Sequence, residues 1–210
     1  GYYSNKNEED LEIDRETPNA ENRLYFSQRN KDTSNYNSQN FKIGTDFFLS
    51  KNHTIGFLVK GNINKSKENS YSVTTIGSNI LDVDSVLKTP SISSRSRNNF
   101  SYNLNYKGIL DTAGQEITID ADYSSYEGEN ASFYQNRFFL QDGSFLKNGQ
   151  IYRNTAPSDI NIKAIKADYV LPVSKVFKIE AGFKYADVES DNNFILENQV
   201  GEGWLNDPKR

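Results

Sequence analysis

The sequence predicts an all-β fold, an antiparallel meander that forms part of a large transmembrane β-barrel with long extracellular loops. Three observations support this prediction. Apolar and polar residues alternate over many segments, as they do in strands whose successive side chains point to opposite faces. Short turns join these segments in pairs, and long polar connections separate the pairs. The 210 residues are only 35% hydrophobic although 13% are aromatic, which suits strands that are apolar on one face better than it suits a compact core.

The composition excludes several classes of protein. No continuous apolar run approaches the roughly 20 residues that a membrane-spanning helix needs, whereas a barrel strand needs only about 9–11 alternating residues. The net charge of -4, without a basic cluster, argues against a nucleic-acid partner. The chain has no cysteine, so it has no disulfide framework, thiolate metal site or cysteine nucleophile.

The first part of the chain is predicted as peripheral. Residues 1–14 begin with aromatic residues and continue into acidic sequence in which Leu11 and Ile13 alternate with acids, so we expect a strand end that leads into a loop. Thr17-Pro18-Asn19 predicts a turn. Residues 23–36 are polar with a few aromatics, and we expect an exposed strand or loop arm there.

Three hairpins carry the clearest alternation. Their arms are 41–49 with 55–63, 100–106 with 117–123, and 165–171 with 177–185, and their turns are 50–53, 111–115 and 172–175. Residues 193–199 predict the start of a further strand, and the tail from residue 201 is predicted as a polar loop. Ile160, Ile162 and Ala164 have the opposite phase to the residues that follow, which predicts a bulge near Ala164 or a change of environment.

Two long connections separate the hairpins. Residues 64–97 are predicted to form a β-ribbon that extends beyond the core sheet, given their content of Ser, Thr, Val and Asn. Residues 127–158 contain Asp142-Gly143 and Asn148-Gly149, two dipeptides typical of tight hairpin turns, and predict a small meander.

The distribution of loop lengths favours a barrel over a sandwich. Alternate connections of a meander lie at opposite ends of the sheet, so all three short turns fall at one end and the long connections at the other. This asymmetry is expected of outer-membrane barrels, which have short periplasmic turns and long extracellular loops. The alternative is a soluble two-sheet sandwich, in which the apolar faces would pack against each other.

Few residues are candidates for chemistry. His53 is the single histidine, and we expect a solvated turn histidine because catalysis or metal binding would need partners at fixed geometry. The acidic residues from Glu8 to Glu16 could bind calcium through clustered oxygens, but they lack a regular ligand spacing, so a solvated loop is the simpler interpretation. We therefore expect a protein that is not an enzyme, with no catalytic residue, no metal site and no cofactor, and the sequence assigns no substrate-binding residue.

The charged residues opposite the apolar positions have two interpretations. They could line a barrel lumen that binds a plug or a polar solute, or they could serve only for solvation and cross-strand pairing. These residues are Lys42, Asp46, Lys60, Lys107, Asp120, Asp122, Lys166, Asp168, Lys178, Glu180 and Lys184. Aromatic side chains of the strands could form the girdles that mark a membrane interface. The candidates are Tyr102, Tyr106, Tyr123, Tyr126, Tyr169, Phe177, Phe183 and Tyr185.

The hairpins resemble a known family. Residues 40–50 with 54–57, then 103–107, 110–112 and 119–123, and finally 166–169 and 180–182 with 191–194, are similar to the outer-membrane β-barrel family of Bacteroidota, relatives of the TonB-dependent receptors. The resemblance implies a signal peptide, a small sandwich-like domain, a plug and a barrel of about 22 strands. We therefore expect residues 1–210 to be an internal excerpt of such a barrel, without its signal peptide, plug and closing strand.

The resemblance implies uptake or transport across the outer membrane of a Gram-negative bacterium. Outer-membrane lipid and the plug of the same chain are the implied partners, and a surface lipoprotein or the subunits of an envelope complex are further candidates. Two other functions stay open at this point. The chain could be a barrel subunit of a secretion or surface-assembly complex, or a soluble extracellular β-sandwich that serves in binding or adhesion.

Overall fold

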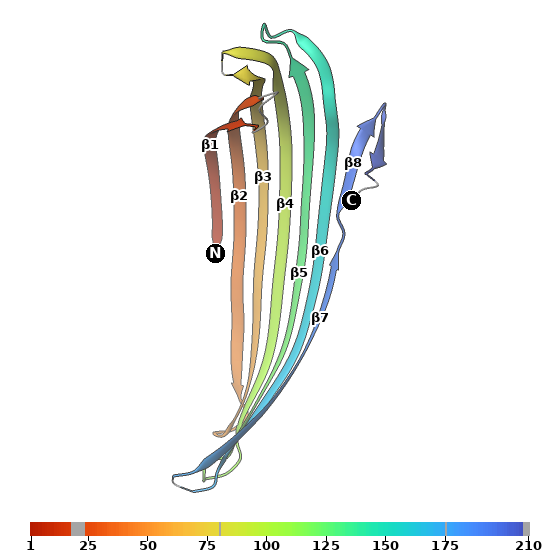
Figure 1. The fold of residues 1–210 in the computed structure, drawn as a ribbon. Coiled ribbons are helices and arrows are strands. Elements are labelled where there is room, and N and C mark those ends of the chain that lie inside the picture. The colour runs from red at the N-terminus through yellow and green to blue at the C-terminus, as the bar shows by residue number, and fades with distance from the viewer. Residues whose placement is uncertain (18–23, 80, 175, 208–210) are drawn as a thin grey trace.

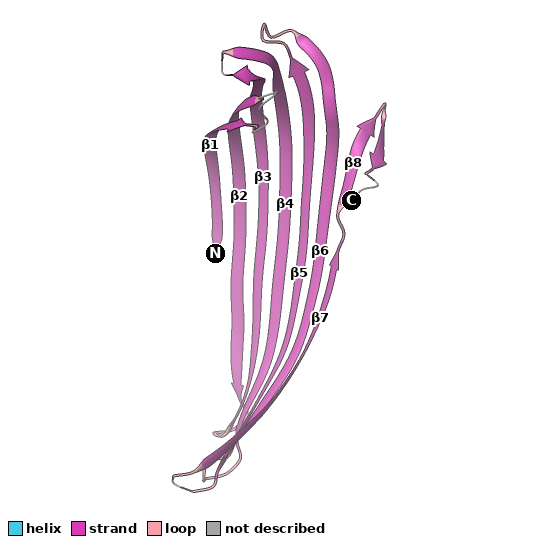
Figure 2. Ribbon diagram, viewed as in Figure 1, coloured by secondary structure: helices cyan, strands magenta, loops and turns pink. Residues whose placement is uncertain are grey.

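The computed structural model describes residues 1–17, 24–79, 81–174 and 176–207. These residues form a single nine-stranded antiparallel sheet without any helix (Figures 1 and 2). The strands follow one another in the sheet in chain order, which makes the sheet a meander, except that the seventh and eighth strands both pair with the sixth. The sequence-based prediction of an all-β meander is therefore confirmed, although the sheet does not close on itself. No helix able to cross a membrane occurs in this part of the chain.

The strand boundaries show where the length of the sheet comes from. The strands are β1 (Tyr2–Glu16), β2 (Tyr25–Phe48), β3 (His53–Asn79), β4 (Asp82–Ile109), β5 (Glu116–Phe139), β6 (Phe145–Pro172), β7 (Lys178–Asn192), β8 (Ile195–Val200) and β9 (Gly203–Asn206). The 28 residues of β4 correspond to about 90 Å at about 3.3 Å per residue. This is more than twice the length that a bilayer requires of a barrel strand.

The long connections are strands and not loops. The ribbon predicted for residues 64–97 is confirmed, since β3 and β4 pair from His53–Gly108 up to Asn79–Asp82. The asymmetry predicted for the loops is therefore an asymmetry of strand length, with tight turns at both ends of the sheet. Polar sequence can continue as strand because the neighbouring strands supply partners for the backbone N–H and C=O groups.

The meander predicted within residues 127–158 is half correct. Gly143 has a φ of +87° in the turn between β5 and β6, and Ser144 donates its backbone N–H to Asp142 Oδ1 at 2.8 Å. The second turn is wrong, because Asn148 and Gly149 lie inside β6. The pairing of β5 with β6 absorbs them through a register shift between Gln135 and Arg137.

The acidic N-terminal segment is also a strand, not a loop. β1 pairs with β2 over its full length, and two of its acids lie opposite basic side chains, Asp10 opposite Lys31 and Glu12 opposite Arg29. Opposite charges on directly facing residues stabilise a strand pair, so this pattern favours the observed register. Pro18 and Asn19 of the predicted turn lie outside the described residues, as does Lys175 of the 172–175 turn.

No bulge occurs near Ala164, because residues 158–170 pair with both neighbouring strands without interruption. The alternative expectation, a change of environment, fits the structure. Ile160 and Ile162 lie on the face opposite to Ile165, and the apolar residues change face at Lys163. A further strand in 193–199 is confirmed as β8, whereas the predicted polar tail contains β9.

One face of the sheet carries a continuous apolar belt near the three short turns. The register places these side chains on the same face: Phe41, Ile43, Phe47, Ile55, Phe57, Val59, Ile63, Phe100, Tyr102, Leu104, Tyr106, Ile117, Ile119, Ala121, Tyr123, Ile165, Ala167, Tyr169, Leu171, Ile179, Ala181, Phe183 and Tyr185. Phe57, Leu104 and Phe183 are 43%, 52% and 64% exposed, and no hydrophobic side chain among the described residues is buried. No second protein layer covers the belt in this part of the chain.

The belt has sharp limits along the strands. From Ile55 to Ile63 it extends about 27 Å along β3, and the next residues on the same face of this strand are Lys65 and Lys67. Rings gather at both limits. At the limit farther from the short turns, which we call the upper limit, the Phe41 and Phe100 rings lie 6.3 Å apart and the Tyr102 and Tyr123 rings lie 6.1 Å apart. The rings near the short turns are those of Phe47, Tyr106 and Tyr169.

Two of the predicted girdle residues do not belong to this belt. Tyr126 lies on the opposite face, because its partners Asn99 and Ile160 face away from the belt. Phe177 lies in the turn before β7 and not in a strand.

The last strands continue the meander with one interruption. β7 and β8 pair with β6 in the same register, since Asn192 faces Ser158 and Ile195 faces Thr155. The gap between them lies beside Pro157, which has no N–H to donate to the ladder. Gly201, with a φ of +61°, occupies the first position of the two-residue turn to β9, as a type II′ hairpin requires.

The tip of the β3–β4 hairpin allows a test of the strand extension. A Cβ atom on Gly77 would lie 1.9 Å from the backbone oxygen of Asp82, so we expect Gly77→Ala to force the two strands apart at their tip. Hydrogen exchange of residues 72–86 in the intact protein should become several-fold faster. Gly203→Ala is the matched control, because its Cβ would meet only Val200 O at 3.8 Å. Unchanged exchange in Gly77→Ala would contradict the tight pairing of the tip.

Candidate functional site

The face opposite the belt is polar and carries every charged residue that the sequence pattern singled out. The register places Lys42, Asp46, Lys60, Lys107, Asp120, Asp122, Lys166, Asp168, Lys178, Glu180 and Lys184 on this one face, at the same height as the belt. We call this surface the polar face. The sheet therefore separates apolar from charged side chains across its thickness, over a height close to that of a bilayer's apolar core.

Near the short turns, three pairs of charged residues on the polar face form ion pairs. Lys107 Nζ lies 2.8 Å from Glu116 Oε2, and Lys178 Nζ lies 2.5 Å from Glu180 Oε1. Lys166 forms a further ion pair with Asp168. The Lys107–Glu116 pair joins β4 and β5, as the simpler interpretation predicted, whereas the other two pairs each join residues of one strand.

Hydrogen bonds continue this network toward the middle of the sheet. Asn103 Nδ2 donates to Asp122 Oδ1 at 2.8 Å, and Asn105 Nδ2 donates to Asn103 Oδ1 at 3.0 Å. Asn105 and Asp46 crowd Gly56, where a Cβ atom would lie 2.5 Å and 2.6 Å from their side-chain oxygens. The close approach of polar groups over a glycine gives the lower polar face a defined arrangement of charges and amides.

His53 is not a turn residue. It begins β3 on the face of the belt, and its Nδ1 lies 2.7 Å from Tyr106 Oη, with the two rings stacked at 6.0 Å. Gly108, directly opposite His53, leaves space for this pair. The sequence did not show the partner, because Tyr106 reaches His53 only diagonally across the β3–β4 pair.

No metal centre is formed by the described residues. Most acids from Glu8 to Glu16 lie in a row on one face of β1, where Asp10 and Glu12 face basic residues of β2, and no group of acids or histidine among the described residues converges on one point. The face of the belt instead carries two shallow recesses above the belt.

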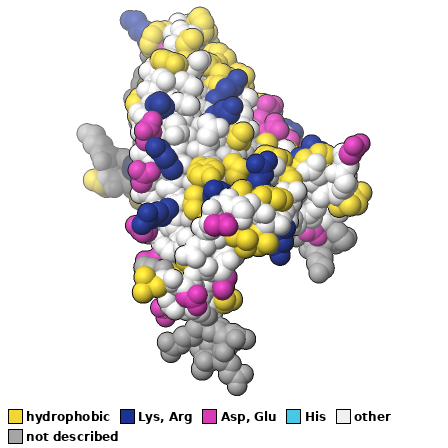
Figure 3. All heavy atoms as spheres, turned by 90° about the horizontal axis from the view of Figure 1, so that it is seen from above, with side chains coloured by type: hydrophobic (Ala, Val, Ile, Leu, Met, Phe, Trp, Pro, Cys, Tyr) yellow, Lys and Arg dark blue, Asp and Glu magenta, His cyan; other side chains and the backbone are white. Residues whose placement is uncertain are grey.

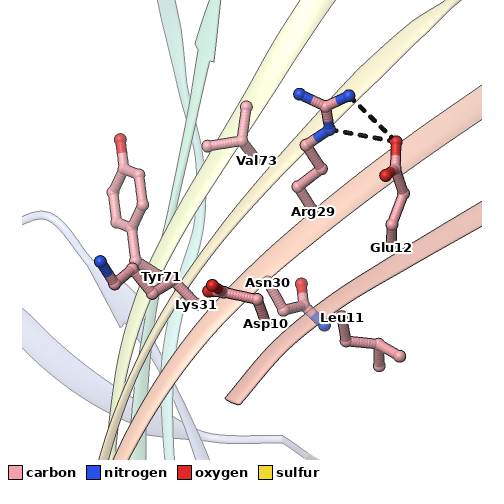
Figure 4. A pocket seen from close by; sticks show the side chains of 8 residues that line it. All are labelled: Asp10, Leu11, Glu12, Arg29, Asn30, Lys31, Tyr71 and Val73. Atoms are coloured by element: carbon pink, nitrogen blue, oxygen red, sulfur yellow. Dashed lines mark hydrogen bonds and ion pairs between the residues drawn. The ribbon is translucent and has the colours of Figure 1, made fainter. Parts of the chain in front are cut away.

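The first recess lies over β1, β2 and β3 and has a volume of about 330 Å³ (Figure 4). It is lined by Asp10, Leu11, Glu12, Arg29, Asn30, Lys31, Tyr71 and Val73. Arg29 donates from Nε and Nη2 to Glu12 Oε1 at 3.1 and 3.0 Å, at the end of the recess where Val73 lies. The Arg29–Glu12 pair neutralises this end, so the recess has no strong preference for one sign of charge.

The second recess lies over β4, β5 and β6 beside the β8–β9 hairpin and has a volume of about 510 Å³. Its charged wall is Arg153, which donates from Nε and Nη2 to the two carboxylate oxygens of Glu197 at 2.6 and 3.1 Å. The Trp204 ring lies 4.4 Å from the Arg153 guanidinium and 6.2 Å from the Phe133 ring, edge to face. Cation–π and aromatic contacts therefore fold the hairpin over this face of the sheet.

The hydrogen bond from Arg153 lowers the pKa of Glu197 below its ordinary value, and the same hydrogen bond raises the pKa of Arg153. The sequence analysis missed this cluster because the segment around Trp204 was predicted as loop. The signal that could have identified it is Gly201-Glu202 between Val200 and Gly203-Trp204, which has the spacing of a two-residue hairpin turn.

Seen from above, acidic, basic and hydrophobic side chains are interspersed over the upper end of the sheet (Figure 3). Neither sign of charge dominates this end. The recesses and the polar face are therefore the candidate functional surfaces of the described residues.

Comparison with known proteins gives one informative match. Residues 108–210 match the model of a family described as outer membrane protein beta-barrel family, which indicates that the protein lies in the outer membrane. Among the solved structures that resemble the chain is the siderophore receptor PiuA from Acinetobacter baumannii, with 8% sequence identity and a TM-score of 0.19. The similarity covers 94% of this chain and 45% of that receptor, and a TM-score this low does not establish a shared fold. No curated protein matches the sequence.

The Arg153–Glu197 pair predicts how the β8–β9 hairpin responds to pH. Because the pKa of Glu197 is lowered in the folded chain from about 4.5, the pair stabilises the hairpin fully above that value. The stabilisation is lost as the pH falls through the lowered pKa. Amide protection factors of residues 195–206 in the intact protein should therefore fall by several-fold between pH 5 and about pH 3. Glu197→Gln should remove this step, and a step of equal size in Glu197→Gln would contradict the assignment.

Proposed function

Because residues 108–210 carry the signature of an outer-membrane β-barrel family, we propose that the chain is a wall segment of a barrel similar to the TonB-dependent receptors and serves in uptake or transport across the outer membrane. One observation carries this proposal. The exposed apolar belt and the charged rows of the polar face occupy opposite faces of the same strands at the same height. A sheet in lipid on one side and in water on the other requires this arrangement.

The dimensions support contact between the belt and outer-membrane lipid. The belt extends about 27 Å along β3, which approaches the apolar band of about 25 Å in outer-membrane barrels once strand tilt is considered. The rings at both limits of the belt, such as Tyr102 above and Tyr106 below, suit the polar–apolar boundary of a membrane. Lipid would cover the side chains that the described residues leave exposed.

The edges of the sheet support membership of a larger barrel. Among the described residues, β1 pairs only with β2 and β7 pairs only with β6, so both strands have a free edge in this part of the chain. Free edges expose unpaired backbone groups, and barrel closure by further strands removes them. In the proposed mechanism the extended strands and a plug of the same chain capture a solute, which then passes along the polar face when the plug moves. A surface lipoprotein is a candidate partner for capture.

A second function, as a barrel subunit of a secretion or surface-assembly complex, is favoured by one separate observation. Beyond the belt, β3 extends from Lys65 to Asn79, about 45 Å, and both recesses lie on the outer face of this extension. A solute inside the barrel would not reach that face, whereas a partner protein would. Co-purification of envelope proteins with the intact protein, lost when residues of the second recess are substituted, would favour this function over transport.

The soluble sandwich receives no support from the structure. A sandwich needs a second sheet packed on the apolar face. The described residues form one sheet, and Leu104 in the middle of its belt is 52% exposed.

The proposal predicts opposite effects for two neighbouring substitutions. Leu104 lies mid-belt, so Leu104→Arg should destabilise the folded barrel by about 2–4 kcal/mol, the effect of Arg at the membrane midplane. Asn103 faces the other way and contacts Asp122, so Asn103→Arg should be tolerated. The measurement is the folded, heat-modifiable fraction of the intact protein in the outer membrane. Equal effects of the two substitutions, or recovery of the wild-type protein in the soluble fraction, would contradict the proposal.

A further inference from the structure

The upper part of the polar face differs in charge from the part near the turns. Above Asp122 and below Glu68, the described residues of this face include Lys42, Lys60, Arg95 and Arg97 and no carboxylate. We call Lys42, Lys60 and Arg97 the basic band, because Arg95 already adjoins Glu68 diagonally. The remaining side chains of this part are mostly Asn, Ser and Tyr. Among the described residues, the lower polar face therefore carries both signs of charge and three ion pairs, whereas the upper polar face carries basic residues without an ion pair.

Two members of the basic band repel each other. Lys42 and Lys60 lie directly opposite on β2 and β3, where facing Cβ atoms are about 5 Å apart. Neither side chain forms an ion pair within the part of the chain that the structure describes, and both are exposed. Like charges in this position destabilise a strand pair. A bound anion between the two ammonium groups would convert this repulsion into attraction.

The surroundings of the two lysines supply further hydrogen-bond donors. A recess of about 430 Å³ contains Lys42 and Lys60 together with Asn40, Asn62, Asn99 and Ser101. The side-chain oxygen Oδ1 of Asn62 already accepts a hydrogen bond from Asn64 Nδ2. The side-chain NH2 group of Asn62 is therefore left to donate. Two ammonium groups, several amides and a hydroxyl are the chemistry that binds a carboxylate or a phosphate.

The position of the recess relative to the belt fits a solute that passes through the barrel along the polar face. Lys60 lies between Val59 and Gly61 of β3, close to the upper limit of the belt at Ile63. A solute entering from the side of the long strands would meet Arg97 first, then the lysine pair, and only then Asp122 and Asp120. The acids below would repel an anion, so its favoured position is the lysine pair.

We propose that this recess, at the juxtaposition of Lys42 and Lys60, is a binding site for a small anionic solute that carries carboxylate or phosphate groups. The inference rests on the proposed transport function, because only a solute that enters the barrel reaches the polar face. It specifies that function by naming the chemical class of the solute. The same anionic chemistry could also come from an acidic side chain of the plug of the same chain. The experiment separates these two sources.

The test compares two double variants of the intact, detergent-purified protein. Citrate is the probe, and its binding is measured by calorimetry at low and at physiological salt. Lys42→Gln with Lys60→Gln should weaken citrate binding by about ten-fold or more, since charge-assisted hydrogen bonds to both lysines are lost. Lys65→Gln with Lys67→Gln is the matched control, because it removes the same charge from β3 on the opposite face and should leave binding within about two-fold.

Each other outcome overturns the inference. Equal weakening by both double variants would show general attraction to positive charge and no site. Absence of citrate binding by the wild-type protein, with a lowered unfolding temperature of the Lys42→Gln, Lys60→Gln variant, would assign the lysines to an acid of the protein's own chain. Outer-membrane fractionation and heat-modifiability of the same samples separate this failure from failure of the transport function. The transport function fails if the wild-type protein is not a folded outer-membrane barrel.

Discussion

An uncovered apolar belt is the constraint on which the rest of the structure depends. A single sheet cannot bury one of its faces, and here Leu104 and Phe183 of the belt are 52% and 64% exposed. Removing such side chains from water stabilises a protein by roughly 1.5–3 kcal/mol each, so a surface of this extent has to be covered. In the proposed arrangement lipid covers it without a second protein layer, which agrees with the outer-membrane family to which residues 108–210 are matched.

The belt and the polar face are consequences of one register. Because facing residues of an antiparallel pair lie on the same face, a slip by one residue anywhere in the meander would exchange side chains between the face of the belt and the polar face. Several contacts oppose such a slip. Glu12 pairs with Arg29, Asn103 donates to Asp122, and Tyr102 stacks on Tyr123, each contact joining two neighbouring strands.

The sequence was most informative where the two faces of the sheet meet different surroundings. The alternation of Phe57 and Leu104 with polar neighbours identified the three hairpins and placed the charged residues that it singled out on one face. Above the belt both faces meet water, the alternation fades, and residues 127–158 could be recognised only through their turn dipeptides. Asn148-Gly149 shows the limit of that approach, because pairing with β5 outweighs the local preference for a turn.

Contacts that join distant strands could not be predicted from the sequence. The Arg153 side chain meets Glu197 and Trp204 only because β8 continues the line of β7 beside β6. The facing of Lys42 and Lys60 likewise follows from the β2–β3 register and not from either segment alone. The facing lysines distinguish the upper polar face from the lower polar face, where three ion pairs form.

The most direct measurement of the central claim is the accessibility of spin labels on adjacent residues of β4 in the intact protein in bilayers. The segment contains no cysteine, so single cysteines at Leu104 and Asn103 can be labelled within it. Relaxation by oxygen, which concentrates in lipid, should be high at position 104 and low at 103, and a water-soluble nickel complex should give the reverse order. A label at position 104 that neither reagent reaches, or one relaxed mainly by the nickel complex, would contradict the lipid-facing belt.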